Sequence, residues 1–382
     1  MNIEMVRILM SGTAGDRIIS AAKCLHETAS DLGIFSYLYK SIPSSIRSGT
    51  VRAQLSFSNA PVVSPVGDCS IEAYFSGDTA CLHHKNNNRK IVFVFDSVSE
   101  VNDDVSLILI DKATQKYFSA PCFFTGMISY LLHIKPPSFI PVLQKNYSEN
   151  PQSAQSIQSD ILKGFLFAKS VFTDDLRYHF SNEQKRLVSL DGNTAFAEGA
   201  LEAGCRFFAS YPISPATTIG DYLAQELPKV HGTVYQAEDE IAAIGTITGA
   251  SFAGVKAMTA TSGPGFSLMQ EFISYLSTVE VPSVIVNVQR AGPSSGIPTH
   301  HSQEDLLAAA FGGHGEDHRI VIAPTSVKNC YHTAIDAFTM AEHYASPVIV
   351  LSSCALAQGN CSIESSDLQN IIEPVSRNIG KT

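Results

Sequence analysis

Four short segments in the second half of the chain combine residue types that could bind a cofactor and an acidic substrate. The first runs Tyr-Pro-Ile-Ser-Pro over residues 211–215. Its two prolines restrict the backbone and hold the Ser214 hydroxyl between them. The hydroxyl could hydrogen-bond a substrate, but the pattern alone favours a rigid loop whose serine caps the next helix.

The second segment places three acidic residues, 238–240, in front of the apolar run Ile-Ala-Ala-Ile-Gly. A carboxylate in the first turn of a helix is stabilised by the positive end of the helix dipole. The Glu240 carboxylate could also face a cofactor. Taken alone, the acidic pattern favours a helix cap.

The third and fourth segments are rich in glycine and proline. Residues 261–265 read Thr-Ser-Gly-Pro-Gly, and the glycines leave the backbone open to close approach by a flat ligand. Arg290 precedes a loop that continues through Thr299. A guanidinium at a strand end suits two-pronged binding of a carboxylate, and the alternative is an ion pair with a nearby acidic residue.

Each of these segments follows or approaches the end of a predicted strand, where open α/β sheets bind their ligands. Apolar runs predict strands at 206–210, 233–236, 256–261, 283–288, 319–323 and 347–351. Helical spacing is found between or beside them at 193–203, 240–252 and 326–341. This alternation predicts a mostly parallel α/β sheet.

The first half of the chain predicts a separate α/β domain. An apolar run at 5–10 leads through Ser-Gly-Thr-Ala-Gly to apolar positions spaced three and four apart over 17–31. This pattern predicts a strand, a turn and a helix, and the turn is either a weak ligand loop or a plain tight turn. Further strands are predicted at 91–95 and 105–110. The polar residues 145–160 predict a linker or a surface edge between domains.

Composition argues against several classes of protein. The 382 residues carry a formal net charge of −10 without a basic stripe, which argues against nucleic-acid binding. No stretch approaches the ~20 apolar residues that span a bilayer, and the N-terminus is typical of a buried strand rather than a signal peptide. We therefore expect a cytoplasmic protein with no membrane association. Charged residues make up only 16%, which favours large cores and some surface covered by a partner chain.

The eight cysteines are spread along the chain and include no CxxC pair. In a cytosolic protein such cysteines act as small apolar residues. Their spacing argues against an iron–sulfur cluster or a zinc site within the chain. If electrons leave through a cluster, another subunit must hold it.

Taken in this order, the four segments resemble the 2-oxoacid:ferredoxin oxidoreductase family. Residues 192–219, 236–270 and 286–324 are similar to successive blocks of the family's thiamine diphosphate (ThDP) pyrimidine-binding domain. Residues 39–50, followed by a strand at 54–58, resemble the family's gamma domain. Many members fuse that gamma domain in front of the pyrimidine-binding domain.

The resemblance implies an α/β protein of two domains. A gamma-like α/β domain is expected at 1–180, and a doubly wound, parallel-sheet ThDP pyrimidine-binding domain at 185–360. A polar tail is expected at 361–382.

The resemblance also implies roles for individual residues. Glu240 falls where the family's cofactor-activating glutamate hydrogen-bonds N1′ of the ThDP aminopyrimidine. Arg290 would bind the substrate carboxylate, with Ser214 as a catalytic hydroxyl and Thr299 as a further substrate contact. The other residues implied in the cofactor pocket are Tyr211, Pro212, Ser262, Gly263 and Pro264.

Two features separate this chain from the family pattern. ThDP enzymes bind the diphosphate and its divalent cation with a Gly-Asp-Gly motif, which is absent from the 382 residues. The resemblance therefore implies a beta subunit that carries this motif, Mg²⁺ and any iron–sulfur cluster, in an alpha2beta2 assembly. The gamma-domain glycine loop is here Ser-Gly-Thr-Ala-Gly-Asp at 11–16, whose acidic side chain disfavours phosphate and hence coenzyme A.

These observations predict the alpha-type subunit of an enzyme that oxidatively decarboxylates a 2-oxo acid and passes electrons to ferredoxin or another acceptor. One alternative is a ThDP decarboxylase or acyl-transfer subunit without a redox step. Another is a non-catalytic scaffold subunit. A nucleotide-binding regulatory protein would rest only on the loop at 11–16.

Overall fold

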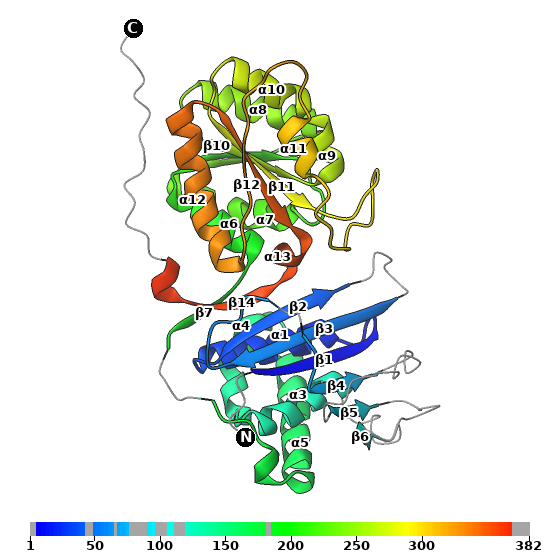
Figure 1. The fold of residues 1–382 in the computed structure, drawn as a ribbon. Helices are drawn as coiled ribbons and strands as arrows, with labels where there is room; N and C mark the ends of the chain where they lie inside the picture. Colours follow the sequence, from blue (N-terminus) through cyan, green and yellow to red (C-terminus); the bar gives the residue numbers. More distant parts are fainter. Residues whose placement is uncertain are drawn as a thin grey trace. The chain divides into compact units, whose positions relative to one another are not determined.

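The chain forms two compact units, each built around one β-sheet (Figure 1). The computed structural model describes residues 5–42, 49–64, 67–75, 90–95, 105–110, 119–180 and 185–368. Part of the segment 39–50 that resembles a gamma domain therefore lies outside the described residues. The first unit is Met1–Ser189 with Asn360–Ser365, and the second is Leu190–Gly359 with Ser366–Thr382. No described helix is both long enough and apolar enough to cross a membrane.

The first unit contains an eight-stranded mixed sheet in the order β6-β5-β4-β1-β3-β2-β14-β7. Its strands are β1 (Met5–Thr13), β2 (Phe35–Ser41), β3 (Thr50–Ser58), β4 (Ile71–Tyr74), β5 (Lys90–Val94), β6 (Val105–Leu109), β7 (Leu187–Asp191) and β14 (Asn360–Glu364). β1 pairs antiparallel with β3 and parallel with β4, so the sheet changes direction at its centre. The strands predicted at 5–10, 91–95 and 105–110 are all present.

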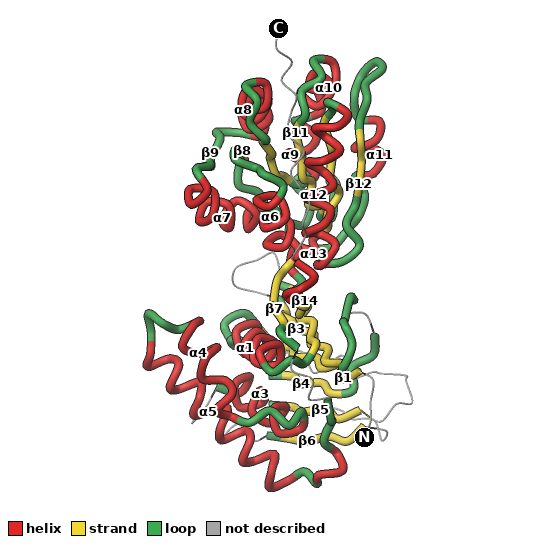
Figure 2. The backbone as a smooth tube through the Cα atoms, turned by 90° about the vertical axis from the view of Figure 1, so that its left-hand side faces the viewer, coloured by secondary structure: helices red, strands yellow, loops and turns green. Residues whose placement is uncertain are grey.

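In the described part of this unit, helices cover one face of the sheet (Figure 2). They are α1 (Ile18–Asp31), α3 (Ala120–Leu131), α4 (Ile140–Asn146) and α5 (Pro151–Val171), with the short 3-10 turns η2 (Pro136–Phe139) and η3 (Asp174–Leu176). α3 and α5 pack with their backbones in direct contact. A Cβ atom on Gly126 would overlap the backbone oxygen of Ile161, and one on Gly164 would overlap that of Phe123. Glycine is therefore required at both helix positions.

The polar residues 145–160 do not form the predicted linker. α5 begins at Pro151, and the Asn150 side chain accepts a hydrogen bond from the Ser153 amide at 3.1 Å. Asn150 and Pro151 are favoured at the N-cap and first position of a helix. The buried residues of α5 recur three or four positions apart, a helical period masked by the surrounding serines and glutamines. These residues are Ile157, Asp160, Ile161, Gly164 and Ala168.

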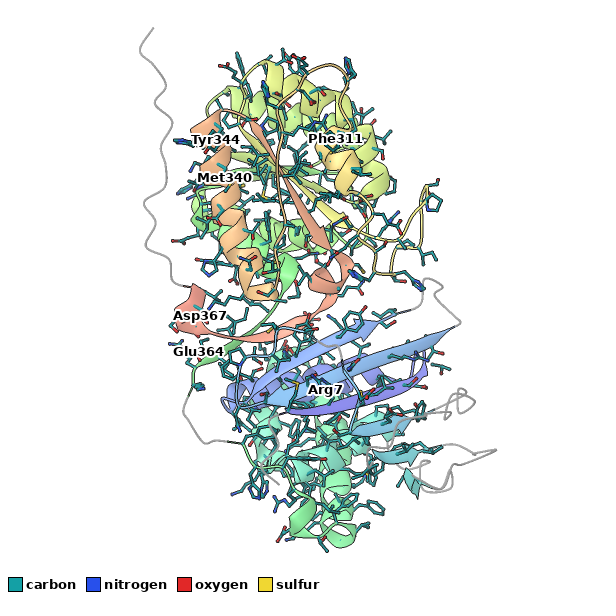
Figure 3. The ribbon with its side chains drawn as sticks, in the orientation of Figure 1. Arg7, Phe311, Met340, Tyr344, Glu364 and Asp367 are labelled. Carbon is teal, nitrogen blue, oxygen red and sulfur yellow. The ribbon has the colours of Figure 1, made fainter. Side chains whose placement is uncertain are left out.

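The start of the predicted polar tail is also a structured element. Residues 361–364 belong to β14, which pairs antiparallel with β2. Glu364 ends this strand and Asp367 lies in the short 3-10 turn η5 (Ser365–Leu368) that follows (Figure 3). Ser362 is 2% exposed, and a buried serine cannot be distinguished from a surface serine by its type. Residues 369–382 lie outside the described residues.

A buried polar network joins β14 to the rest of the first unit. The His26 ring nitrogens lie 2.7 Å from the Ser189 hydroxyl and 2.8 Å from the Ser36 hydroxyl. Ser362 completes the network, with hydroxyl contacts of 2.6 Å to Ser30 and 2.9 Å to Ser36. Burial, followed by the charges of nearby lysines, lowers the pKa of His26 to about 3. His26 is therefore neutral and can bind its hydroxyl partners as donor and acceptor.

The second unit contains a six-stranded sheet in the order β12-β13-β11-β10-β8-β9, and all neighbouring strands are parallel. Its strands are β8 (Phe207–Ser210), β9 (Thr233–Gln236), β10 (Ala257–Thr261), β11 (Ser283–Gln289), β12 (Ile320–Ile322) and β13 (Pro347–Ser353). β10, β11 and β13 are buried along their whole length. Strands buried in this way are typical of a parallel sheet covered by helices on both faces.

Helices cover both faces of this second sheet. The helices are α6 (Gly192–Glu202), α7 (Thr217–Glu226), α8 (Glu240–Phe252), α9 (Gly263–Leu268), α10 (Gln270–Thr278), α11 (Leu306–Phe311), α12 (Val327–Tyr344) and α13 (Cys354–Gln358), with the 3-10 turn η4 (Leu227–Val230). α8 and α10 pack in one apolar cluster with alternate residues of β10, β11 and β13. α6 and α12 pack against each other on the opposite side (Figure 1). This doubly wound α/β arrangement confirms the predicted fold class of the region.

The buried histidine makes the stability of the first unit depend on pH. Unfolding restores the ordinary pKa of His26, 6.5, so below that pH the unfolded chain binds a proton that the folded unit does not. Above pH 6.5 His26 is neutral in both the folded and the unfolded chain and does not change the free energy of unfolding. Below pH 6.5 it lowers that free energy, and the decrease grows as the pH falls toward 3. We expect the free energy of unfolding to fall by about 1.4 kcal/mol per pH unit from this group.

Urea unfolding followed by circular dichroism between about pH 7 and about pH 5 measures this slope. The matched variant is His26→Gln, which removes the titrating ring and should flatten the dependence. Equal slopes in the two proteins would show that other groups cause the pH dependence.

Candidate cofactor and substrate site

The predicted site residues lie along one edge of the second sheet. Residues 211–215 follow β8, Glu240 follows β9, residues 262–265 follow β10, and Arg290 follows β11. These four strands are adjacent and parallel, so their carboxyl ends share one edge. The structure therefore brings together segments that are up to 79 positions apart in the chain, at the place where such sheets bind ligands.

Glu240 is a buried carboxylate that has no partner among the residues the structure describes. The helix cap that the acidic pattern suggested is provided by its neighbour: the Asp239 carboxylate accepts a hydrogen bond from the Ala242 amide at 2.6 Å. Glu240 is 7% exposed and forms no hydrogen bond or ion pair with any described residue. Because burying an unpaired carboxylate is costly, this position suits a group that hydrogen-bonds to a ligand.

Gly265 forms the surface on which the Glu240 side chain lies. A Cβ atom at residue 265 would lie 2.5 Å from Glu240 Oε1 and 2.6 Å from its Cγ, and would overlap the Thr261 hydroxyl. Only glycine leaves room for the carboxylate here. The resemblance did not assign a role to Gly265, although its place in the Gly-Pro-Gly sequence was a signal for close approach.

Ser262 and Gly263 position the turn between β10 and α9. The Ser262 hydroxyl is fully buried and donates to the carbonyl of Val288 at 2.8 Å, joining the ends of β10 and β11. Gly263 opens α9, and Pro264 occupies its second position. The Ser262 hydroxyl is thus used to hold the turn, and the sequence pattern alone did not predict this contact.

Arg290 is buried and has no carboxylate partner among the described residues. It is 8% exposed, and its Nη1 and Nη2 atoms donate to the carbonyls of Ser214 and Ser295 at 2.6 Å each. Its Nε is buried and has no partner in the described part of the chain. Burial lowers the pKa of Arg290. The structural ion pair considered as an alternative is not formed among the described residues, so the positive charge suits an anionic ligand.

The remaining predicted residues lie beside this arginine. Ser214 contacts Arg290 through its backbone carbonyl. The Thr299 hydroxyl, in the loop that follows Arg290, is buried and unpaired among the described residues. Tyr211 is 42% exposed and Pro212 is exposed next to it. Asn193, which sequence reasoning missed, donates to the Pro215 carbonyl and the Thr218 hydroxyl at 2.8 Å each and so supports the 211–215 loop.

Acidic, histidine and cysteine side chains do not gather into a metal site in the described parts of the chain. Seven cysteines there are free and buried. The groups at this edge of the sheet without a partner in the described residues are the Glu240 carboxylate, the Arg290 Nε and the Thr299 hydroxyl, beside an open glycine turn.

Comparison with known proteins identifies the class of this domain. Residues 198–379 match the family described as pyruvate flavodoxin/ferredoxin oxidoreductase, thiamine diphosphate-binding. The chain is 53% identical over 163 residues to the 2-oxoglutarate synthase subunit KorA of Methanocaldococcus jannaschii, a match covering 43% of this chain and 44% of the relative. It is 45% identical over 167 residues to the ketoisovalerate oxidoreductase subunit VorB of Methanothermobacter marburgensis, covering 44% and 47%. These matches span less than half the length of the relatives.

A solved structure extends the similarity beyond this domain. The 2-oxoglutarate:ferredoxin oxidoreductase from Magnetococcus marinus, with 2-oxoglutarate, coenzyme A and succinyl-CoA bound, is 32% identical with a TM-score of 0.87, and the match covers 95% of this chain and 66% of that one. The second unit is thus a ThDP-binding domain. The chain belongs to the 2-oxoacid:ferredoxin oxidoreductase family, whose alpha subunits are among its relatives.

The contact between Gly265 and Glu240 predicts opposite effects for two glycine substitutions. Gly265→Ala should lower the free energy of unfolding by about 2 kcal/mol, because the new methyl group overlaps buried side chains. Gly249→Ala in α8 should raise it by about 0.5–1 kcal/mol, since a Cβ there meets no atom within 4 Å and alanine favours the helix.

Urea unfolding of the purified chain measures both changes. Equal stability of Gly265→Ala and the unmodified protein would mean that Glu240 does not pack on this glycine.

Proposed function

We propose that this chain is the alpha-type subunit of a ThDP-dependent enzyme that oxidatively decarboxylates a 2-oxo acid. The observation that carries the proposal is Glu240, a buried carboxylate with no described partner, above a glycine turn at the edge of a parallel sheet. The relatives named as subunits of a 2-oxoglutarate synthase and of 2-oxoacid and ketoisovalerate oxidoreductases support it.

The residues around Glu240 fit the pyrimidine half of ThDP. A flat aminopyrimidine needs an open turn on which to lie and a carboxylate to hydrogen-bond its N1′, and Gly263, Gly265 and Glu240 offer both. When bound, ThDP supplies a nucleophilic carbon that adds to the 2-oxo carbon and accepts the electron pair left by departing carbon dioxide. Glu240 would hold a proton at N1′ and so assist proton transfer within the cofactor.

Arg290 would bind and orient the substrate carboxylate. Its guanidinium is already fixed by two carbonyls, so little side-chain entropy is lost when the substrate binds. Its buried Nε and the Thr299 hydroxyl have no described partners and would both face an anionic ligand. The Ser214 hydroxyl would add a further hydrogen bond. Tyr211, Pro212, Ser262 and Pro264 would shape the surrounding pocket.

A beta subunit would complete the active site. The relatives are named as subunits, and the Gly-Asp-Gly motif for the diphosphate does not occur in these 382 residues. The partner would hold Mg²⁺, the ThDP diphosphate and any iron–sulfur cluster, in an alpha2beta2 assembly in the cytoplasm. Electrons would pass to ferredoxin or another acceptor. Residues 1–180 would form a gamma-like domain and 185–360 the pyrimidine-binding domain.

The substrate class is a 2-oxo acid, and the names of the relatives define a short panel for testing. They include 2-oxoglutarate and ketoisovalerate enzymes. The complex, purified through a tag on this chain, would be supplied with 2-oxoglutarate, 2-oxoisovalerate or pyruvate, with ThDP, Mg²⁺, coenzyme A and a dye acceptor. Dye reduction that depends on one acid supports the oxidative reaction, whereas aldehyde release without dye reduction supports a decarboxylase.

Glu240→Gln should reduce ThDP-dependent turnover at least ~100-fold, because an amide cannot hold the proton at N1′. The complex should still assemble, since the two side chains are nearly equal in size. The measurement is dye reduction together with subunit stoichiometry from gel filtration.

Glu238→Gln is the matched control, because this neighbouring glutamate is exposed. Its turnover should equal that of the unmodified complex. Full activity in Glu240→Gln would favour a scaffold role for this chain.

A further inference from the structure

Two buried amide side chains on β11 are both directed at a single residue, Asp305. Asn287 Nδ2 donates to Asp305 Oδ2 at 2.9 Å, and Gln289 Oε1 accepts a hydrogen bond from the Asp305 amide at 3.1 Å. Asn287 is 0% exposed and Gln289 is 4% exposed. Gln289 also donates to the carbonyl of Ser352 in β13 at 3.1 Å. We call the three residues Asn287, Gln289 and Asp305 the amide clasp.

The amide clasp closes the base of the loop that carries the substrate-binding residues. The loop runs over residues 290–304, so Gln289 and Asp305 are its two flanking residues. Within it, the Ala291 amide donates to the His300 carbonyl at 3.0 Å, and the Ile297 amide donates to the Ala291 carbonyl at 2.9 Å. These bonds make the loop compact, and the clasp anchors its ends to the centre of the sheet.

Asp305 also contacts the turn that supports the cofactor glutamate. A Cβ atom on Gly263 would lie 3.3 Å from Asp305 Oδ2 and 3.6 Å from Oδ1, so the carboxylate lies against the backbone of Gly263. Two residues further on, Gly265 packs against the Glu240 side chain. Asp305 thus lies between the loop that follows Arg290 and the turn that supports Glu240. It contacts the β11 amides at the base of the loop and the backbone of Gly263 in the turn.

The amide clasp is not a helix cap for α11. Asp305 precedes α11, yet its side chain makes no capping hydrogen bond there. Asn287 Oδ1 is buried and has no partner in the described residues, a cost that an apolar residue in β11 would avoid. A buried amide that is only half satisfied is typical of a position selected for the geometry it imposes rather than for stability.

We propose that Asp305 is a positioning residue, which acts through the amide clasp to hold the Arg290 guanidinium at a set place relative to the Glu240 turn. This inference rests on the proposed function. Asp305 does not bind the substrate itself. Without its carboxylate only the bond from the Asp305 backbone amide to Gln289 remains at this end of the 290–304 loop, and Arg290 is less often placed to receive the 2-oxo acid carboxylate.

The test compares Asp305→Ala with Asp305→Asn in the purified complex, using the acid of the panel with the highest kcat/KM. Alanine removes the acceptor for Asn287, whereas the asparagine carbonyl can still accept that hydrogen bond. We expect KM to rise about tenfold in Asp305→Ala and to remain within about threefold of the unmodified complex in Asp305→Asn. The amount of bound ThDP should not change in either variant.

Asp336→Ala is the control for removal of an aspartate. Asp336 is exposed on α12, far along the chain from the clasp, and its loss should leave KM unchanged. A purely structural role for Asp305 would lower the melting temperature and the active fraction but would leave KM at its original value.

A double-mutant cycle determines whether Asp305 acts through Arg290. In an Arg290→Lys background the two-pronged guanidinium is already lost, so adding Asp305→Ala should raise KM by less than about twofold. An undiminished rise in that background, or an unchanged KM in Asp305→Ala alone, would overturn the inference. An unmodified complex that turns over none of the acids would instead contradict the proposed function.

Discussion

The candidate site depends on one buried carboxylate, that of Glu240, which lies at the end of a parallel sheet and is paired with no group in the described part of the chain. Glu240 is free for a ligand because Asp239, one residue earlier, caps α8 in its place. Gly265 leaves space for the side chain, and Ser262 ties that turn to β11. Together these neighbours leave the largely buried carboxylate available for a hydrogen bond to a ligand.

The same edge of the sheet separates opposite charges. Arg290 is held on backbone carbonyls of Ser214 and Ser295 rather than on an acidic side chain. A guanidinium paired with a protein carboxylate would have to break that pair to bind a substrate, whereas carbonyl dipoles orient the group and leave its charge available. The anionic substrate and the cofactor would then each meet the complementary group.

One buried polar cluster of the first unit differs, because the members of the His26 network hydrogen-bond to one another. His26 is neutral and surrounded by serine hydroxyls that come from α1, β2, β7 and β14. This network attaches a strand from the far end of the chain, β14, to a sheet formed mainly by the first 110 residues. Satisfied networks of this kind specify one arrangement of strands more than they add stability.

The sequence by itself determined the alternation of strands and helices in residues 206–353, because buried parallel strands are continuous apolar runs and their helices have a distinct period. It also singled out Glu240, Arg290 and the glycine turn as candidates, since a carboxylate, a guanidinium and an open glycine backbone are residue types suited to ligand binding. Only the tertiary structure decided which polar residues are structural: that Ser362 and the helix after Asn150 are parts of the core, and that Asn287 and Gln289 hold Asp305. The reason is physical, because burial and partners across 16 or more residues depend on the packing of strands and helices and leave no periodic trace in the chain.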